Sequence, residues 1–222
     1  MHFIQQFASR RMAAGAGASL LLIGGLMLSG CGFGKTDAAT RGQQLYQTCV
    51  PCHGTDGSGN IQVGAPNIAG MQEWYVEGEL DKFRAGSRGM QFSDMEGMRM
   101  RPMALSLMTD DSVKLVAHYV QTMPQVRHAP SIPGDPQAGA ALYTACSSCH
   151  GVRGEGKQAL KAPRLAGLND WYLATELRKF RRGIRGADPR DHEGKLMGIM
   201  ERSLRDNDAI RNVVAYIGTL KP

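Results

Sequence analysis

Cysteine is scarce in this chain: only 5 of its 222 residues are cysteines. Apart from Cys31, they form two close pairs, Cys49 with Cys52 and Cys146 with Cys149. Proteins of oxidising compartments usually use their cysteines as disulfides. Two pairs with only two intervening residues each are poor geometry for a disulfide framework. The cysteines therefore need another explanation.

A convincing alternation of apolar and polar residues, the pattern of a half-buried strand, is also missing. Apolar residues recur at helical spacing instead, for example after Trp74 and after Trp171. Aromatic residues make up only 6% of the chain and do not combine with basic residues into a surface that reads nucleic acid. The sequence therefore predicts an all-α protein without a nucleic-acid partner.

The long apolar run at the N-terminus has the layout of an export signal: Arg10 and Arg11 precede "MAAGAGASLLLIGGLML". The run ends in "LSGC", which resembles a bacterial lipobox, whose cysteine is lipidated and becomes the new N-terminus. We expect residues 1–30 to be a lipoprotein-type signal peptide, and Cys31 to begin a tether that ends at residue 39, because several acyl chains give stable anchoring. An uncleaved transmembrane helix, and ordinary cleavage with a free cysteine, are the alternatives. In each case the folded part lies on the periplasmic side of the membrane.

An internal repeat organises the rest of the chain. A shift of 97 residues aligns the sequence with itself without a gap, so that "GQQLYQTCVPCHGTDGSG" falls on "GAALYTACSSCHGVRGEG" and "APNIAGMQEWY" falls on "APRLAGLNDWY". We expect a first domain over residues 40–126, a proline-containing linker over residues 127–136 and a second domain over residues 137–222. Each domain is small for an apolar core alone, so a large buried cofactor would help it to fold.

Each repeat has the same predicted helices. A short amphipathic helix precedes each cysteine pair, at Gly42–Thr48 and Gly139–Ala145, and a glycine-rich loop broken by Pro66 or Pro163 follows. A second helix begins near Trp74 or Trp171. A last helix follows Thr109 or Asp206, either of which is a suitable N-cap residue.

The two cysteine pairs belong to the motif C-x-x-C-H, the attachment signature of c-type haem. We expect Cys49 and Cys52 to form thioethers with one haem and His53 to bind its iron. Cys146, Cys149 and His150 repeat the pattern for a second haem. A single copy would also suit a zinc half-site or a redox dithiol. A zinc site needs both pairs in one coordination sphere, which two separate repeats do not naturally provide.

The second axial ligand separates a carrier from a catalyst. Most of the 13 methionines are expected to be core residues, but two pairs recur at equivalent positions before the last helix. We expect Met103 and Met200 to be the ligands, with Met100 and Met197 as the alternatives. Thioether ligation favours ferrous iron and raises the reduction potential.

With these motifs in place, each repeat resembles a class I cytochrome c, and the tandem resembles the di-haem cytochrome c4 type. The resemblance rests on "CVPCHG", "PNIAG", "WY", "RPM" and "VAHYV" in the first repeat and on "CSSCHG", "PRLAG", "WY", "GIM" and "VVAYI" in the second. It covers residues 40–222. It implies that each domain wraps around one covalently bound haem c. "LMGIMERSLRD" lacks the proline of "RPMALSLMTDD", so the choice between Met197 and Met200 is less secure.

Further side chains are candidates for contacts with the haems. Those expected near the propionates, unless they only pack or face solvent, are Trp74, Tyr75, Trp171, Tyr172, Arg84, Arg88, Arg181 and Arg185. The loops at Pro66 and Pro163 are expected to supply a backbone carbonyl that accepts the histidine N–H. We expect His118, His128 and His192, which have no equivalent in the other repeat, to lie at the surface.

Charge differs between the repeats. Residues 40–125 carry seven basic and nine acidic side chains, whereas residues 137–222 carry fifteen basic and nine acidic ones. Such asymmetry steers encounter and orientation more than it sets affinity. We expect redox proteins as partners, one domain meeting the donor and the other the acceptor, and no small-molecule substrate.

These observations predict a membrane-anchored di-haem electron carrier between a dehydrogenase or quinol-oxidising complex and a terminal oxidase or reductase. A permanent subunit of such a complex is the first alternative. A di-haem peroxidase or thiosulfate-oxidising cytochrome would need one open iron, which the methionines in both repeats argue against. A Cu(I) site in the run "GMQFSDMEGMRMRPMALSLM" would suit soft thioethers, but the second repeat does not preserve this density of methionine.

Overall fold

The structure is a computed structural model that describes residues 37–221. Within this range it is helical, with two isolated β-bridges, Asn60–Ala65 and Lys157–Ala162, and no named strand. None of the described helices is long and apolar enough to cross a membrane. The predicted signal, the tether up to residue 36 and the lipidation site Cys31 lie outside the described residues. The prediction of an all-α fold is confirmed.

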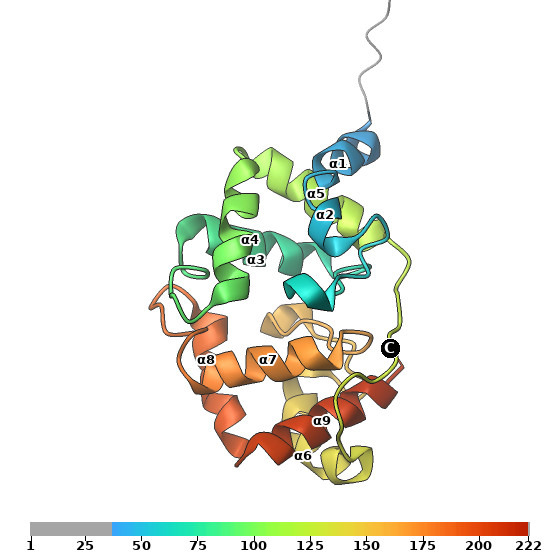
Figure 1. The fold of residues 1–222 in the computed structure, drawn as a ribbon, viewed down its shortest axis with the longest axis vertical. Helices are drawn as coiled ribbons and strands as arrows, with labels where there is room; N and C mark the ends of the chain where they lie inside the picture. The colour runs from blue at the N-terminus through green and yellow to red at the C-terminus, as the bar shows by residue number, and fades with distance from the viewer. Residues whose placement is uncertain (1–36, 222) are drawn as a thin grey trace, which may run out of the picture. The chain divides into compact units, whose positions relative to one another are not determined.

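The helices of the first half, called domain 1 below, are α1 (Ala38–Tyr46), α2 (Val50–His53), η1 (Ile61–Val63), α3 (Glu73–Ala85), α4 (Met95–Ser106) and α5 (Asp110–Thr122). Those of the second half, called domain 2, are α6 (Pro136–His150), η2 (Gln158–Leu160), α7 (Asp170–Arg181), α8 (His192–Met200), η3 (Glu201–Ser203) and α9 (Asn207–Thr219). Figure 1 shows domain 1 in blue to green and domain 2 in yellow to red. The repeat in the sequence thus becomes a repeat of helices.

The first and last helix of each domain cross closely, and a glycine makes the crossing possible. A Cβ atom on Gly42 of α1 would lie 2.4 Å from the carbonyl oxygen of Leu115 in α5. A Cβ atom on Gly139 of α6 would lie 2.0 Å from the carbonyl oxygen of Asn212 in α9. Only glycine permits this approach of two backbones. One turn further on, aromatic pairs extend the contact, with ring centroids 5.4 Å apart in Tyr46–Tyr119 and in Tyr143–Tyr216.

Each domain has its own apolar core beside this crossing. In domain 1 the buried residues include Phe83 of α3 and Val116 of α5. In domain 2 they include Leu173 of α7 and Val214 of α9. The predicted N-caps of the last helices are confirmed, because the Thr109 and Asp206 side chains accept hydrogen bonds from the backbone N–H groups of Ser112 and Ala209.

Two features of the helices differ from the sequence-based prediction. In domain 1, turns separate α1 from the short α2, whereas in domain 2 the single helix α6 runs through both cysteines to His150. Pro51 accounts for this difference, since a proline inside a helix clashes with the carbonyl four residues earlier. The methionine-rich segments also fold into helices, α4 and α8, that were not predicted. Their apolar residues follow no clear amphipathic pattern, so the sequence offered little signal for them.

Candidate functional site

The four described cysteines, those of the two motifs, form no disulfide. Cys52 is exposed and the other three are half-buried. Burial raises the pKa of the Cys49 thiol to about 11, with a further contribution from Cys52, and burial likewise raises the pKa of Cys146. A redox dithiol or a thiolate ligand needs a lowered thiol pKa. The surroundings of these thiols therefore favour neutral sulfur.

The two motif histidines are buried and held in the same way. His53 is 6% exposed and its Nδ1 lies 2.9 Å from the carbonyl oxygen of Pro66. His150 is 5% exposed and its Nδ1 lies 2.8 Å from the carbonyl oxygen of Pro163. A carbonyl can only accept, so Nδ1 carries the proton and donates, and the lone pair of Nε2 is left for another partner. The predicted carbonyl contacts at both prolines are present.

Electrostatics also keeps these rings neutral. Burial lowers the pKa of His53 and of His150, because a charged imidazolium would lose its hydration, and the hydrogen bond to the proline carbonyl only partly opposes this effect. A neutral imidazole fixed through Nδ1 is the form that binds a metal through Nε2. Among residues 37–221, no three side chains of the His, Cys, Asp and Glu types gather as a metal site. The neutral, oriented imidazoles of His53 and His150 are suited to binding iron.

A cavity in domain 2 brings the predicted site residues together. Cys146, Cys149 and His150 line one part of it, and Met197 and Met200 line another. Leucines from two loops and from α7, together with Phe180, Val213 and Ile217, contribute apolar walls. A cavity with two thiols, one buried imidazole, a thioether and apolar walls fits a covalently attached haem.

The candidate sixth ligands lie on the two helices that were not predicted. In domain 1, Met100 packs against the apolar core and Met103 is 37% exposed. In domain 2, Met197 and Met200 are both half-buried. Because residues three apart on a helix lie on nearly the same face, each pair presents its two sulfurs to one side of its helix.

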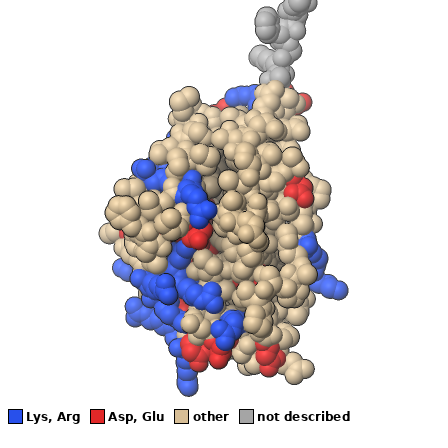
Figure 2. Space-filling model, in the orientation of Figure 1, with Lys and Arg blue, Asp and Glu red and all other residues tan. Residues whose placement is uncertain are grey.

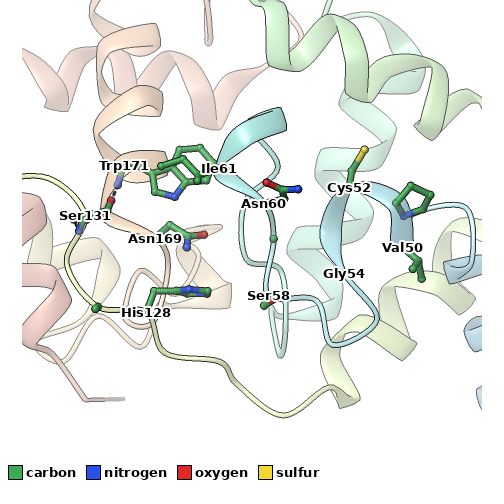
Figure 3. A pocket seen from close by; sticks show the side chains of 14 residues that line it. Val50, Cys52, Gly54, Ser58, Asn60, Ile61, His128, Ser131, Asn169 and Trp171 are labelled. Atoms are coloured by element: carbon green, nitrogen blue, oxygen red, sulfur yellow. Dashed lines mark hydrogen bonds between the residues drawn. The ribbon is translucent and has the colours of Figure 1, made fainter.

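The other predicted haem contacts are distributed across both domains. Trp74 and Tyr75 of α3 in domain 1 line the cavity of domain 2, as does Tyr172 of α7. Trp171 lines a different pocket, close to Ile61 and Ser131. Cys52 lines the opposite side of this pocket (Figure 3). The neighbouring domain therefore completes the wall of the domain 2 cavity.

The four candidate arginines divide into two kinds. Arg88 and Arg185 are buried, 7% and 8% exposed, so the alternative of a solvent-facing role is wrong for them. Arg84 forms ion pairs with Asp81 and with the exposed Asp110 at the surface. Arg181 of α7, which occupies the equivalent place in domain 2, pairs instead with a buried carboxylate.

His118, His128 and His192 are exposed, as predicted. His118 lies 2.8 Å from a carboxylate oxygen of Glu73 through its Nδ1. His128 lines the pocket of Figure 3. His192 is the first residue of α8.

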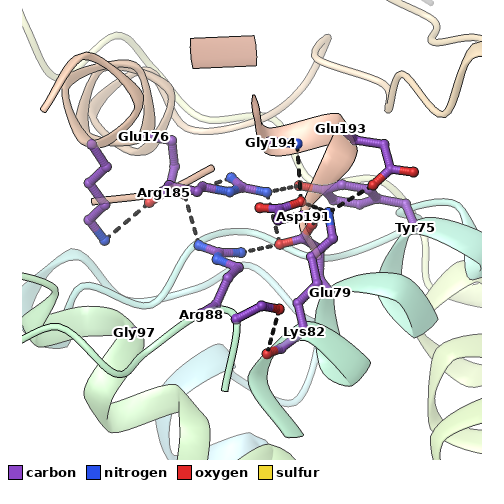
Figure 4. A network of polar contacts seen from close by, with 12 residues as sticks. Tyr75, Glu79, Lys82, Arg88, Gly97, Glu176, Arg185, Asp191, Glu193 and Gly194 are labelled. Atoms are coloured by element: carbon purple, nitrogen blue, oxygen red, sulfur yellow. Dashed lines mark hydrogen bonds and ion pairs between the residues drawn. The ribbon is translucent and has the colours of Figure 1, made fainter. Parts of the chain in front are cut away.

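A buried network of charged side chains joins the two domains (Figure 4). Arg88 contacts the carboxylate of Glu79 and donates to that of Glu176 at 2.8 Å. Arg185 lies 2.8 Å from the carboxylate of Glu79 and 2.7 Å from that of Glu176. Burial alone would raise the pKa of both glutamates. The positive charges of the two arginines and of one lysine beside each glutamate outweigh burial, so that both pKa values are lowered. Two arginines thus share two carboxylates across the domain boundary.

Lysines extend this network on both sides. Lys82 lies 2.7 Å from Asp191 and 3.6 Å from Glu193. In the mirror arrangement, Lys179 lies 2.6 Å from Asp94 and 3.0 Å from Glu96. Each member of the network has a counterpart in the other domain, 97 residues away in the sequence. The matched segments "ELDKFRAGSRG" and "ELRKFRRGIRG" contain most of the network. This repeated pattern was the available signal for the glutamates and lysines of the network, which were not predicted as functional residues.

Known proteins similar to this chain were identified by sequence and by structure. The sequence model of the family described as "Cytochrome c" matches residues 39–124 and 136–221. The chain is 30% identical over 202 residues to the thiosulfate dehydrogenase electron acceptor of Stutzerimonas stutzeri (strain A1501), covering 82% of this chain and 87% of that protein. It is also 30% identical over 206 residues to cytochrome c4 of Azotobacter vinelandii, covering 86% and 93%. The solved structure of reduced recombinant cytochrome c4 from Pseudomonas stutzeri superimposes with a TM-score of 0.68 at 26% identity, covering 82% of this chain and 98% of that one.

Proposed function

Since this chain belongs to the cytochrome c family and is a di-haem electron-transfer protein with two haem c groups, we propose that it is a periplasmic, lipid-anchored carrier. It passes single electrons between a dehydrogenase or quinol-oxidising complex and a terminal oxidase or reductase. The observation that carries the haem sites of this proposal is the geometry of His53 and His150, each buried, neutral and held through Nδ1 by a proline carbonyl beside the two cysteines of its motif. When bound, the haem iron supplies one-electron chemistry.

The protein's own residues hold each haem in two ways. Cys49 and Cys52 attach the first group through thioethers, and Cys146 and Cys149 attach the second. His53 and His150 would each bind the iron through Nε2, because the carbonyl of Pro66 or Pro163 fixes the tautomer and the ring orientation. Both rings are buried, which would exclude water from this nitrogen.

The sixth ligands in this proposal are Met103 and Met200, with Met100 and Met197 as alternatives. In domain 2 the support is that both candidates line the same cavity as His150. In domain 1 the support is the place of both candidates on α4, the equivalent of α8. A thioether on each iron closes it to small substrates and favours the ferrous state.

Anchoring is proposed from the sequence alone. Residues 1–30 would be removed, Cys31 would carry the lipid, and the segment up to residue 39 would tether domain 1 to the membrane. A Cys31→Ser variant tests this point. It should bind both haems but no longer incorporate labelled palmitate, whereas the unaltered protein should incorporate it.

The proposed partners are redox proteins, and the different charges of the two domains determine which domain each partner meets. Domain 2 carries an excess of basic residues and domain 1 a slight excess of acidic ones, and the visible face of domain 2 shows a gathering of lysine and arginine (Figure 2). An acidic partner surface is therefore steered to domain 2. A relative is named as an electron acceptor of thiosulfate dehydrogenase, which supports a dehydrogenase as donor. The second candidate function is that of a permanent subunit of such a complex.

The visible spectrum of the purified, reduced protein with and without carbon monoxide tests the haem sites. We expect two haems per chain by pyridine haemochrome analysis, and no spectral change with carbon monoxide, because strong sixth ligands close both irons. A change in half of the haem would mean that one iron is open. A content of one haem or none would contradict attachment at both motifs.

A further inference from the structure

A surface rich in arginine covers the part of domain 2 where the end of α7 meets η3 and the start of α9. Three of its arginines come from the end of α7, two from η3 and the loop after it, and one from α9. We call this surface the arginine face, and its members are Arg178, Arg181, Arg182, Arg202, Arg205 and Arg211. Figure 2 shows basic side chains gathered over this part of domain 2.

Contacts between these segments bring the arginines together. Arg181 Nη2 donates to the backbone carbonyl oxygens of Leu204, at 2.7 Å, and of Asp206, at 3.4 Å. The loop that contains Arg205 therefore lies against the end of α7. Burial lowers the pKa of Arg178, and three other arginines of the face lower it further through their positive charges. Like charges thus lie close together on this surface.

Few carboxylates neutralise the arginine face. Arg181 pairs with the buried Glu201, and Arg211 pairs with Asp208. Asp206 and Asp208 are the only exposed acidic residues between positions 202 and 211. Within residues 37–221, the members of the face that form no ion pair are Arg178, Arg182, Arg202 and Arg205. The face therefore keeps an excess of positive charge.

Domain 1 does not repeat this charge. The four arginines without an ion pair correspond to one acidic and three neutral residues, 97 positions earlier. These equivalents are Asp81, Ala85, Leu105 and Met108, of which the last two are exposed apolar side chains. The other two members of the face stay basic, as Arg84 and Lys114. The fold itself therefore does not require an arginine-rich surface at this place, and the charge is a property of domain 2.

The arginine face is the outer side of segments that wall the domain 2 cavity. Along α7 and along the segment after Met200, residues that line the cavity alternate with members of the face. The lining residues of these two segments include Leu177, Phe180, Ser203 and Leu204. A protein bound on the arginine face would therefore lie one chain segment away from a haem in this cavity.

We propose that the arginine face is the surface through which domain 2 docks the acidic surface of a redox-protein partner. This inference rests on the proposed function, because it needs a haem in the domain 2 cavity. Exposed cations without ion pairs of their own suit a transient contact, since they steer the encounter with clustered carboxylates. One electron passes in each encounter between the redox group of the partner and the domain 2 haem, and one of the two is oxidised as the other is reduced.

An anionic membrane is the other surface that exposed arginines could meet. In Figure 1, α1, where the described chain begins, and α9 lie at opposite ends of the two domains. A lipid at Cys31 would hold the chain to a membrane through the α1 end. This separation favours a protein as the occupant of the arginine face.

Stopped-flow reduction of the full-length, oxidised di-haem protein tests the proposal. The probe is reduced flavodoxin, a small acidic flavoprotein whose flavin gives one electron to a ferric haem. In the triple variant Arg182→Gln, Arg202→Gln and Arg205→Gln, we expect the second-order rate constant at low ionic strength to fall by about fivefold or more, within the range that electrostatic steering contributes. The rate constants of the variant and of the unaltered protein should converge at high salt. The single variant Arg205→Glu should lower the rate constant in the same direction.

The matched control removes the same number of positive charges elsewhere. Lys114→Gln, Arg127→Gln and Lys221→Gln change three exposed residues, and together they should lower the rate constant by about twofold at most, because salt screens distant charges. An equal loss in both triple variants would mean that only net charge matters and would overturn the proposal. A salt-independent reaction of the unaltered protein would overturn it as well.

Sedimentation with vesicles of phosphatidylglycerol and phosphatidylcholine tests the membrane, in a Cys31→Ser background. We expect the arginine triple variant to leave vesicle binding unchanged. Salt-sensitive vesicle binding that this variant abolishes, together with an unchanged reaction with flavodoxin, would assign the arginine face to the membrane and contradict the proposal. A content of fewer than two haems in the unaltered protein would instead contradict the proposed function, whatever the rate constants.

Discussion

Lys82 of domain 1 lies 2.7 Å from Asp191, the N-cap residue of α8 in domain 2. The Asp191 side chain is fully buried and also accepts the backbone N–H of Gly194 at 3.0 Å. Lys179 of domain 2 makes the same contact with Asp94, the N-cap residue of α4. A carboxylate at a helix N-terminus is favoured by the helix dipole. Each domain thus fixes the start of the methionine-bearing helix of the other.

Loss of this lysine should destabilise the protein. In Lys82→Met the Asp191 carboxylate loses its cation while remaining buried, and removal of one partner of a buried pair is strongly unfavourable. We expect the free energy of unfolding to fall by about 2–3 kcal/mol, somewhat below the value for a fully buried pair because Lys82 is partly exposed. Urea denaturation followed by circular dichroism measures it. Lys114→Met on the exposed face of α5 is the control and should change stability little.

The shared glutamates should make the domain boundary sensitive to acid. The positive charges around Glu79 lower its pKa below the ordinary value of 4.5 in spite of burial. A lowered folded-state pKa means that the stabilisation is fully present above pH 4.5 and is lost as the pH falls below it. Urea unfolding at a series of pH values between 3 and 7 should show this loss in the unaltered protein.

A Glu79→Gln variant should be less stable at neutral pH and lose less stability on acidification, since it has no carboxylate to protonate there. Glu77→Gln is its control, because Glu77 is on the same helix and the pKa of its carboxyl is raised, chiefly by burial. An equal acid dependence of Glu79→Gln and the unaltered protein would rule out Glu79 as the source of the effect.

The close helix crossings predict opposite effects for alanine at different glycines. Gly42→Ala or Gly139→Ala places a Cβ atom against a carbonyl of the facing helix, and overpacking of this kind costs about 1–3 kcal/mol. Gly218→Ala in α9, where no atom lies within 4 Å of the added Cβ and the residue is exposed, should stabilise the protein by up to about 0.5–1 kcal/mol. Thermal melts of the three variants provide the comparison. A stabilised Gly139→Ala protein would show that α6 and α9 are further apart than described.

The sixth ligands can be identified one methionine at a time. Met200→Ala should open the iron of domain 2, so that half of the haem binds carbon monoxide in the reduced protein, and Met103→Ala should do the same in domain 1. Met197→Ala and Met100→Ala are the matched controls and should leave the carbon monoxide difference spectrum flat. The reverse result within a pair would assign the other methionine.

The sequence alone determined the helical class, the two repeats and the two C-x-x-C-H motifs. The reason is that "CVPCHG" and "CSSCHG" are local patterns, in which the spacing itself carries the chemistry. The helix caps at Thr109 and Asp206 were predictable for the same reason, since capping involves residues only three apart.

Tertiary structure alone decided which distant residues meet. The identity of Glu79 with Glu176 and of Arg88 with Arg185 was visible in the repeat, but their mutual ion pairs depend on how two domains pack. The helical state of the segments with Met103 and Met200 was not predictable, because their apolar residues lack a clear period. The burial of Glu201, the partner of Arg181, was not predictable either. An acidic side chain is ordinarily exposed, and only packing around the cavity removes it from water.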